Sequence, residues 1–258
     1  MIKRRPKLPS ADKLQMYFGD PYIVDVPEVP GTFTITQPTL DDVVKCGEQK
    51  ILSTVGIFTT NTTQHRALLW ERNIDWNEIT DFELFCILYR GLDQDVVTLL
   101  FGDGVDFSKF EPKSINLTGE PQTILYNKED NVVINETVYY LISDYLRDAF
   151  NMHPENEYTE DRFMKKWWIE KDKREAARKQ DKPKESFTMQ PLISACINHP
   201  GFKYNLQTIR ELTICQFYDS VRRLQLYESA TAVMKGMYSG MIDSKKIKPE
   251  SYNWMGAV

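Results

Sequence analysis

The residues that could carry chemistry in this chain are few and widely spaced. Its 258 residues include only 3 histidines and 4 cysteines. Cys196 and His199 lie three positions apart, a spacing that suits two zinc ligands on one helix. A structural zinc site needs four ligands, however, and the sequence offers no second pair. We therefore interpret His199 as a helix-end histidine that interacts with the negative end of the helix dipole.

Signatures of catalysis and of ion or nucleotide binding are weak or missing in the sequence. The segment from Gly102 to Asp106 (GDGVD) could hold a cation, but a calcium loop needs more oxygen ligands at set positions, so the pattern favours a turn. The chain has no G-x-S-x-G, H-E-x-x-H, cysteine-protease, phosphate-loop or dinucleotide-binding motif. We therefore expect a protein that is not an enzyme and uses no cofactor or metal. An enzyme of unrecognised type stays open, and it would need a pocket with convergent polar groups.

The composition is typical of an intracellular globular protein. The chain is 41% hydrophobic and 12% aromatic, which is enough to build a core, and its net charge of −5 gives no overall attraction to nucleic acid or acidic membranes. No apolar run reaches the ~20 residues of a membrane span, and no apolar region follows the basic start MIKRRPK, so we expect no signal peptide. The cysteines form no CxxC pair, and we interpret them as packing residues in a reducing compartment; they are Cys46, Cys86, Cys196 and Cys215.

The segment 160–185 is the most distinctive, because it carries ten Lys or Arg and seven Asp or Glu, a surplus of three positive charges. Phe163 lies four residues before Trp167, and Met164 four before Trp168, which predicts an aromatic face on a helix. Our first interpretation is a solvent-exposed helix that joins two domains. Alternatively, the tryptophans dock on a partner protein or fix the helix to its own domain. A nucleic-acid contact is a further alternative, through Lys165, Lys166, Arg174, Arg178, Lys179 and Lys182.

The C-terminal end offers a second candidate surface. Thr213 and Gln216 form a capping box at the start of a long predicted helix, 214–239. Its far end carries methionines, which recur on adaptable binding faces, and two large aromatic residues follow in the tail. We therefore predict partner binding there, with packing against the same chain as the alternative; the candidates are Met234, Met237, Tyr252 and Trp254.

The hydrophobic pattern predicts an α+β fold that is predominantly helical. We expect strands in 22–36 and 123–134, a loop over 102–120, and helices at 39–54, 80–89 and 136–150. The predicted organisation is an N-terminal arm (1–20), a mixed α+β domain (21–155), a charged linker helix (160–185) and a helical C-terminal domain (186–258).

Two stretches of the sequence combine elements in a characteristic order. The first combines a threonine-rich strand (32–37), the acidic helix start Thr39-Leu40-Asp41-Asp42 and the helix 79–85. The second runs from Leu212 to Val221 and leads to Gly240-Met241-Ile242-Asp243. Both stretches resemble tail and baseplate morphogenesis proteins of tailed bacteriophages, including tail assembly chaperones and baseplate hub assembly proteins.

This resemblance implies a non-enzymatic protein of the virion or of tail assembly. Its partners would be other tail or baseplate proteins, with self-assembly as a further option, and neither nucleic acid nor a membrane is expected. Its place would be the host cytoplasm during assembly, or the virion itself. The alternative function is a nucleic-acid-binding adaptor that uses the basic and aromatic helix 162–182.

Overall fold

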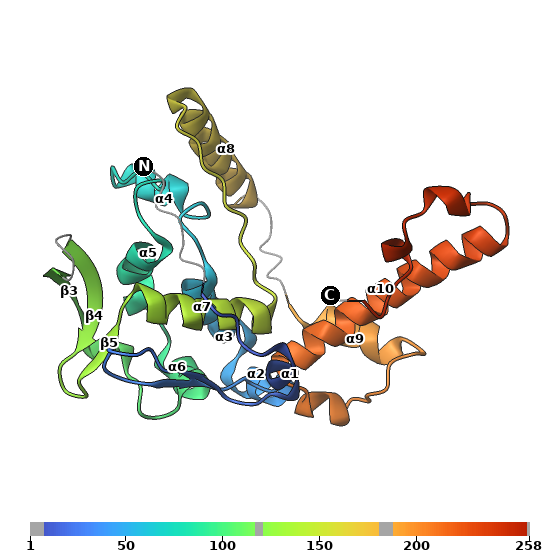
Figure 1. Cartoon of the computed structure of the whole chain (residues 1–258), viewed down its shortest axis with the longest axis horizontal. Coiled ribbons are helices and arrows are strands. Elements are labelled where there is room, and N and C mark those ends of the chain that lie inside the picture. The colour runs from blue at the N-terminus through green and yellow to red at the C-terminus, as the bar shows by residue number, and fades with distance from the viewer. Residues whose placement is uncertain (1–7, 117–120, 181–187, 257–258) are drawn as a thin grey trace.

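The computed structural model describes residues 8–116, 121–180 and 188–256, and it confirms a predominantly helical α+β fold, with 55% helix and 11% strand. Short helices and two small sheets form a body, from which α8 and α10 project (Figure 1). The α-helices are α1 (Lys13–Phe18), α2 (Leu40–Cys46), α3 (Glu48–Thr59), α4 (Arg66–Glu71), α5 (Asp81–Leu88), α6 (Gln94–Phe101), α7 (Glu136–Phe150), α8 (Arg162–Gln180), α9 (Gln190–Asn198) and α10 (Ile214–Tyr238). Short 3-10 turns are η1 (Tyr89–Gly91), η2 (Phe107–Lys109), η3 (Thr208–Glu211), η4 (Ser244–Lys246) and η5 (Pro249–Ser251).

Helix starts follow the capping signals in the sequence. Thr80 and Thr213 form the predicted capping boxes at the first turns of α5 and α10. Asn135 caps α7, where its side-chain oxygen accepts a hydrogen bond from the Val138 amide at 2.9 Å. The predicted helices 136–150 and 214–239 are therefore confirmed, and the apolar stripe of α7 is buried throughout.

The predicted single helix 39–54 is wrong, because two helices occupy this region. Gly47 adopts φ 102°, a conformation open to glycine but strained for other residues, and it ends α2 before α3 begins. The second helix then continues beyond the predicted end, to Thr59.

The two sheets are small and antiparallel. β1 (Tyr22–Val24) pairs with β2 (Phe33–Ile35), as predicted. The predicted hairpin at 123–134 is also confirmed, as β4 (Pro121–Asn127) and β5 (Val132–Ile134). The predicted loop 102–120, however, contains the edge strand β3 (Phe110–Asn116). Residues 111–114 are exposed and polar or proline, so this strand lacks the apolar alternation that would have predicted it.

One large core joins the two halves of the chain. Ile214 and Phe217 of α10 are buried in the same cluster as the core residues of α2, α3, α6 and α7. Backbone hydrogen bonds reinforce this join: the Leu40 amide donates to the Leu212 carbonyl, and the Ile214 amide to the Pro38 carbonyl, each at 3.0 Å. The predicted domain division stays a prediction. In the described residues, the stretches before and after α8 share this core.

The predicted N-terminal arm (1–20) and the predicted linker helix (160–185) both extend beyond the described residues. Within the predicted arm, α1 is packed, since Met16 is buried in the main core, while residues 1–7 lie outside the described part. A helix, α8, is observed at the position of the predicted linker, and positions 181–185 lie outside the described residues. The linker role stays a prediction.

A second, smaller core positions α8. Leu69 of α4, Trp76, Leu84 of α5 and Ile169 of α8 form it, and all four are nearly inaccessible to solvent. This cluster is separate from the main core. It therefore fixes one face of α8 against the α4 region.

Candidate interaction surfaces

The structure places the two adjacent tryptophans of α8 in different surroundings. Trp168 packs against the small core, with its ring 6.5 Å from that of Trp76, and the Arg66 guanidinium lies 5.2 Å from its ring centroid. Trp167, in contrast, is 49% exposed, and Phe163 one turn earlier is 74% exposed. Of the two predicted anchors, Trp168 therefore contacts its own chain, while Trp167 is presented to solvent.

Ion pairs add to this attachment of α8. Asp172 accepts two hydrogen bonds from buried Arg66, at 2.5 Å to Nε and 2.7 Å to Nη2. Lys165 pairs with Asp75, and Lys173 of α8 lies 2.8 Å from the Glu71 carboxylate. The expectation of a solvent-exposed linker helix is therefore corrected: one face of α8 is docked by a bidentate pair and apolar contacts.

These contacts also bear on the nucleic-acid candidates of α8. Lys165 is only 15% exposed and is occupied by Asp75, whereas Lys166, Arg174 and Arg178 are solvent-accessible. The side chain of Lys179 and the whole of Lys182 lie outside the described residues.

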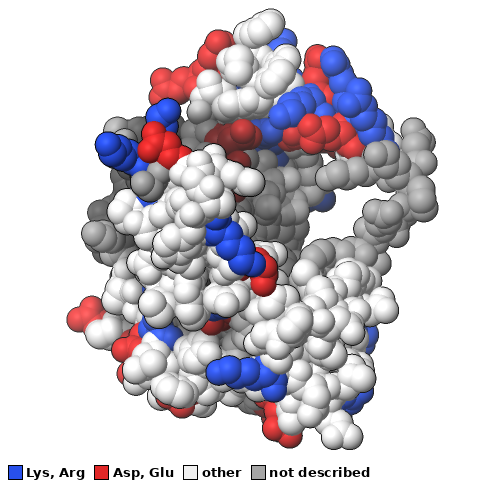
Figure 2. Space-filling model, turned by 90° about the vertical axis from the view of Figure 1, so that its right-hand side faces the viewer, with Lys and Arg blue, Asp and Glu red and all other residues white. Residues whose placement is uncertain are grey.

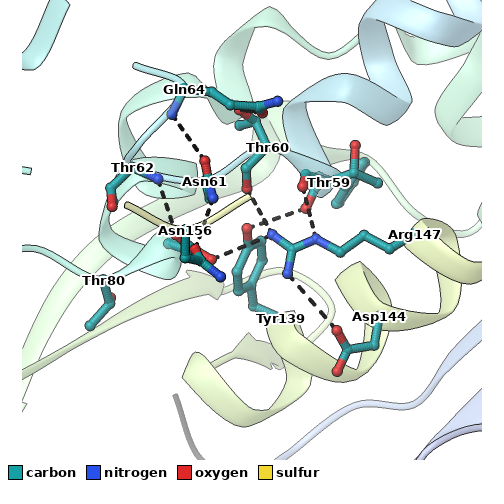
Figure 3. Close-up of polar contacts among 12 residues, drawn as sticks. Thr59, Thr60, Asn61, Thr62, Gln64, Thr80, Tyr139, Asp144, Arg147 and Asn156 are labelled. Carbon is teal, nitrogen blue, oxygen red and sulfur yellow. Dashed lines mark hydrogen bonds and ion pairs between the residues drawn. The ribbon is translucent and has the colours of Figure 1, made fainter. Parts of the chain in front are cut away.

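A buried polar junction lies between α3, α7 and the segment before α8 (Figure 3). Arg147 of α7 donates from Nε to the Thr59 carbonyl at 2.8 Å and from Nη2 to the Thr60 carbonyl at 2.9 Å. The same Nη2 lies 3.4 Å from the Asp81 carboxylate. These bonds satisfy carbonyls at the end of α3 that the helix itself cannot pair.

The junction continues through Asn61, which is fully buried. Its side-chain nitrogen donates to the Glu155 carbonyl and to the Asn156 side chain, both at 2.8 Å, and its oxygen accepts from the Gln64 amide at 3.0 Å. Sequence reasoning missed this junction, because a threonine-rich connection has the composition of a surface turn. The available signal was the position of Arg147, between Leu146 and the apolar pair Ala149 and Phe150 of the predicted helix.

Two adjoining hollows lie beside the junction. One, of about 620 Å³, is lined by Thr60, His65, Leu88 and Met152 among others, and the second, of about 670 Å³, borders the Arg66 pair. The carboxylates of Asp172 and Glu157 in the second are already bound to Arg66. These ion pairs therefore join α4 to α8 and to the segment that precedes α8.

We expect His65, which lines both hollows, to make stability depend on pH. Burial lowers the pKa of its imidazole below the ordinary value of 6.5. Between pH 6.5 and this lowered pKa, His65 is protonated more fully in the unfolded chain than in the folded chain. The contribution of His65 to stability therefore decreases as pH falls through 6.5 towards the lowered pKa. In urea unfolding at about pH 7.5 and 5.5, His65→Gln should lose less stability on acidification than the native chain. Equal losses would contradict this.

The C-terminal candidates lie on an arm that projects from the body, formed by residues 222–256 and called the C-terminal arm below (Figure 1). The tail folds back along α10: the ring of Trp254 meets Tyr227 edge-on at 5.3 Å, and Arg223 donates to the Trp254 carbonyl at 2.9 Å. Trp254 is therefore half-buried against its own chain. Half-buried positions are also found for Met234, Met237 and Tyr252.

The most exposed apolar side chains of the C-terminal arm are different ones. Tyr238 is 86% exposed, Met241 87% and Met255 73%. Tyr238 is the last residue of α10, and Met241 and Met255 lie beyond the helix. The helix stripe pointed to the methionines at this end, including Met241, but it did not select Tyr238 or Met255. Viewed towards the arm, the surface is mostly uncharged, and charged side chains of both signs gather at the top, over the α8 region (Figure 2).

Residues 179–258 match the family model of the YomV second domain. This is a phage-related family, named after a protein of a Bacillus prophage, so the match supports a phage origin for the chain. No curated protein and no solved structure matches the chain. The matched residues include α9, α10 and the whole C-terminal arm.

The two candidate zinc ligands, Cys196 and His199, lie within this YomV-like segment. Cys196 is buried, and His199 Nε2 lies 3.0 Å from the Glu228 carboxylate. Across the described ranges, no three His, Cys, Asp or Glu side chains gather in a way that could hold a metal ion. Among those same residues, every helix is too short or too polar to cross a bilayer.

All four cysteines are free thiols, and two of them should be unreactive. Burial raises the pKa of Cys86 to about 12 and that of Cys215, in the YomV-like segment, to about 11. Because the thiolate is the reacting form, both should react with Ellman's reagent at least about a hundredfold more slowly than a free thiol near pH 8. Peptide mapping after timed labelling measures each rate, with the denatured chain as control. Labelling of either residue at the free-thiol rate would be inconsistent with burial.

Proposed function

We propose that this chain is a non-enzymatic phage protein that acts in tail or baseplate structure or assembly through protein–protein contacts. The observation that supports this most is the C-terminal arm, which lies in the phage-related segment and exposes Tyr238, Met241 and Met255. Single exposed apolar residues are common on proteins. Tyr238 and Met241 lie three positions apart at the end of α10, where two neighbouring exposed apolar side chains are a candidate surface for a partner.

The internal chemistry of the molecule agrees with a contact function. Arg66 and Arg147, the two buried arginines among the residues that the structure describes, are engaged by carbonyls and carboxylates of the chain. Burial raises the pKa of Cys86 and Cys215, which makes these thiols weak nucleophiles. The place of action in this proposal is the host cytoplasm during assembly, with the virion as the second location to examine.

The test is fractionation of the tagged chain from phage-producing cells. Particles and tail intermediates are separated by sedimentation, and the proteins that travel with the chain are identified by mass spectrometry. The native chain should sediment with tail or baseplate proteins. The double variant Tyr238→Gln, Met241→Gln should lose this association, because the arm would no longer bury two large apolar side chains.

The matched control is Leu206→Gln, which removes a side chain that is 69% exposed in the same segment but outside the arm. This variant should fractionate like the native chain. If the native chain migrates only as a free protein of 30.2 kDa, the proposal is wrong. If it travels with capsid or replication proteins instead, the tail and baseplate assignment is wrong.

A further inference from the structure

The face of α8 turned away from the body carries a continuous stripe of aromatic and cationic side chains. Its members are spaced by three or four residues, so they lie on one side of the helix. We call this set the outer stripe; it consists of Phe163, Trp167, Lys171, Arg174 and Arg178. The opposite face, with Trp168, Ile169 and Asp172, is the one that docks on the body.

The aromatic end of the outer stripe offers an apolar platform. Phe163 is 74% exposed and Trp167 is 49% exposed, although α8 is otherwise rich in charge. The ammonium of Lys171 lies 5.8 Å from the Trp167 ring centroid, which leaves much of the ring accessible. A hollow of about 280 Å³ adjoins this ring and extends along Arg174, Glu175 and Arg178. This volume is enough for one side chain of a bound segment and the atoms next to it.

The charges of the outer stripe favour an acidic protein segment over a nucleic acid. Arg174 is 3.1 Å from Glu170, and Lys171 is 4.0 Å from Glu175, so two carboxylates are interleaved with the cations. A polyanion such as single-stranded nucleic acid has phosphates at regular intervals and would bring some of them close to both carboxylates. A protein segment can instead place individual carboxylates at the cations, where arginine forms paired hydrogen bonds.

We propose that the outer stripe docks an acidic segment of a partner protein. The segment places one large apolar side chain against Phe163 and Trp167 and sets carboxylates beside Lys171, Arg174 and Arg178. This inference rests on the proposed function, because it assumes that the chain works through protein contacts. It assigns a different surface from the C-terminal arm, so the two surfaces can be tested separately.

The experiment selects peptides from a random library of about 16 residues on the purified full-length chain. The enriched peptides should combine Asp or Glu with one large apolar residue, and the affinity of the best peptide is then measured by fluorescence anisotropy. Trp167→Ala should weaken binding by about tenfold or more, as expected for an aromatic anchor. Arg174→Glu with Arg178→Glu should have an effect of similar size, since both contacts become repulsive.

Two controls make the outcomes distinguishable. Tyr238→Gln on the C-terminal arm should leave the peptide affinity unchanged, and circular dichroism should show that the α8 variants stay folded. Absence of enriched peptides, enrichment without acidic residues, or binding unaffected by Trp167→Ala would each overturn the proposal. So would binding of oligo(dT) at low salt that is lost in the arginine variant, because it assigns the stripe to nucleic acid. If selection fails while the chain still sediments with tail proteins, the α8 proposal alone is rejected.

Discussion

Replacing Arg147 with methionine is expected to lower the free energy of unfolding by about 3–5 kcal/mol, the loss typical of a buried charge partner that is removed. The guanidinium is nearly inaccessible and donates to the carbonyls of Thr59 and Thr60. Methionine fills much of the volume but donates no hydrogen bond. The two carbonyls would lose their bonds, and the Asp81 carboxylate, which is 12% exposed, would lose its cation. Urea unfolding followed by circular dichroism measures the difference.

Arg210→Met is the matched control for this substitution. Arg210 is 56% exposed and pairs with Asp41 at 2.7 Å, so its removal should cost no more than about 1 kcal/mol. Adding Asp81→Asn to Arg147→Met should recover part of the loss, because the remaining carboxylate is neutralised. A loss below about 1 kcal/mol for Arg147→Met would show that the junction is not a main source of stability.

Trp76→Ala is expected to destabilise the small core by about 3–5 kcal/mol, the range observed when a large buried aromatic side chain is truncated. Trp76 is fully buried, between the rings of Trp70 and Trp168, and its indole nitrogen donates to the Glu157 carbonyl at 3.2 Å. Since this cluster is separate from the main core, the effect should be local. Hydrogen exchange should show faster exchange in α4 and α8 and little change in α7.

Trp167→Ala provides the comparison on the same helix. Trp167 is half-exposed and lies outside the small core, so stability should change by less than about 1 kcal/mol. Equal loss of protection in α4, α8 and α7 of the Trp76 variant would contradict a separate small core. In that case the two clusters would unfold as one unit.

Local patterns predicted most of the elements. The stripe of α7 and the capping boxes at Thr80 and Thr213 are decided by residues within one or two turns, so sequence alone located these helix starts. The strand β3 was missed because its pairing with β4, rather than its own residues, makes it a strand. The break at Gly47 was missed because the apolar pattern continues across it.

The sequence did not determine which side chains of the candidate surfaces face the solvent. The sequence singled out Trp167 and Trp168 together, but adjacent helix positions point about 100° apart, so only one of them could dock on the body. The choice depends on Trp76 and Arg66, which lie some ninety to a hundred positions earlier in the chain. The polar junction escaped prediction for the same reason, since Asn61 finds its partners in residues 155 and 156.

The main core contains residues from before and after α8, and this limits when the core can form during synthesis. Phe217 and Ile214 fill the main core beside α7, and the Leu212 carbonyl pairs with the Leu40 amide. On the ribosome, the first two thirds of the chain must therefore wait for its last third before that core closes. Until then, apolar surface that α10 will cover stays open to other nascent chains. Early binding of a chaperone or an assembly partner would protect the growing chain during this interval.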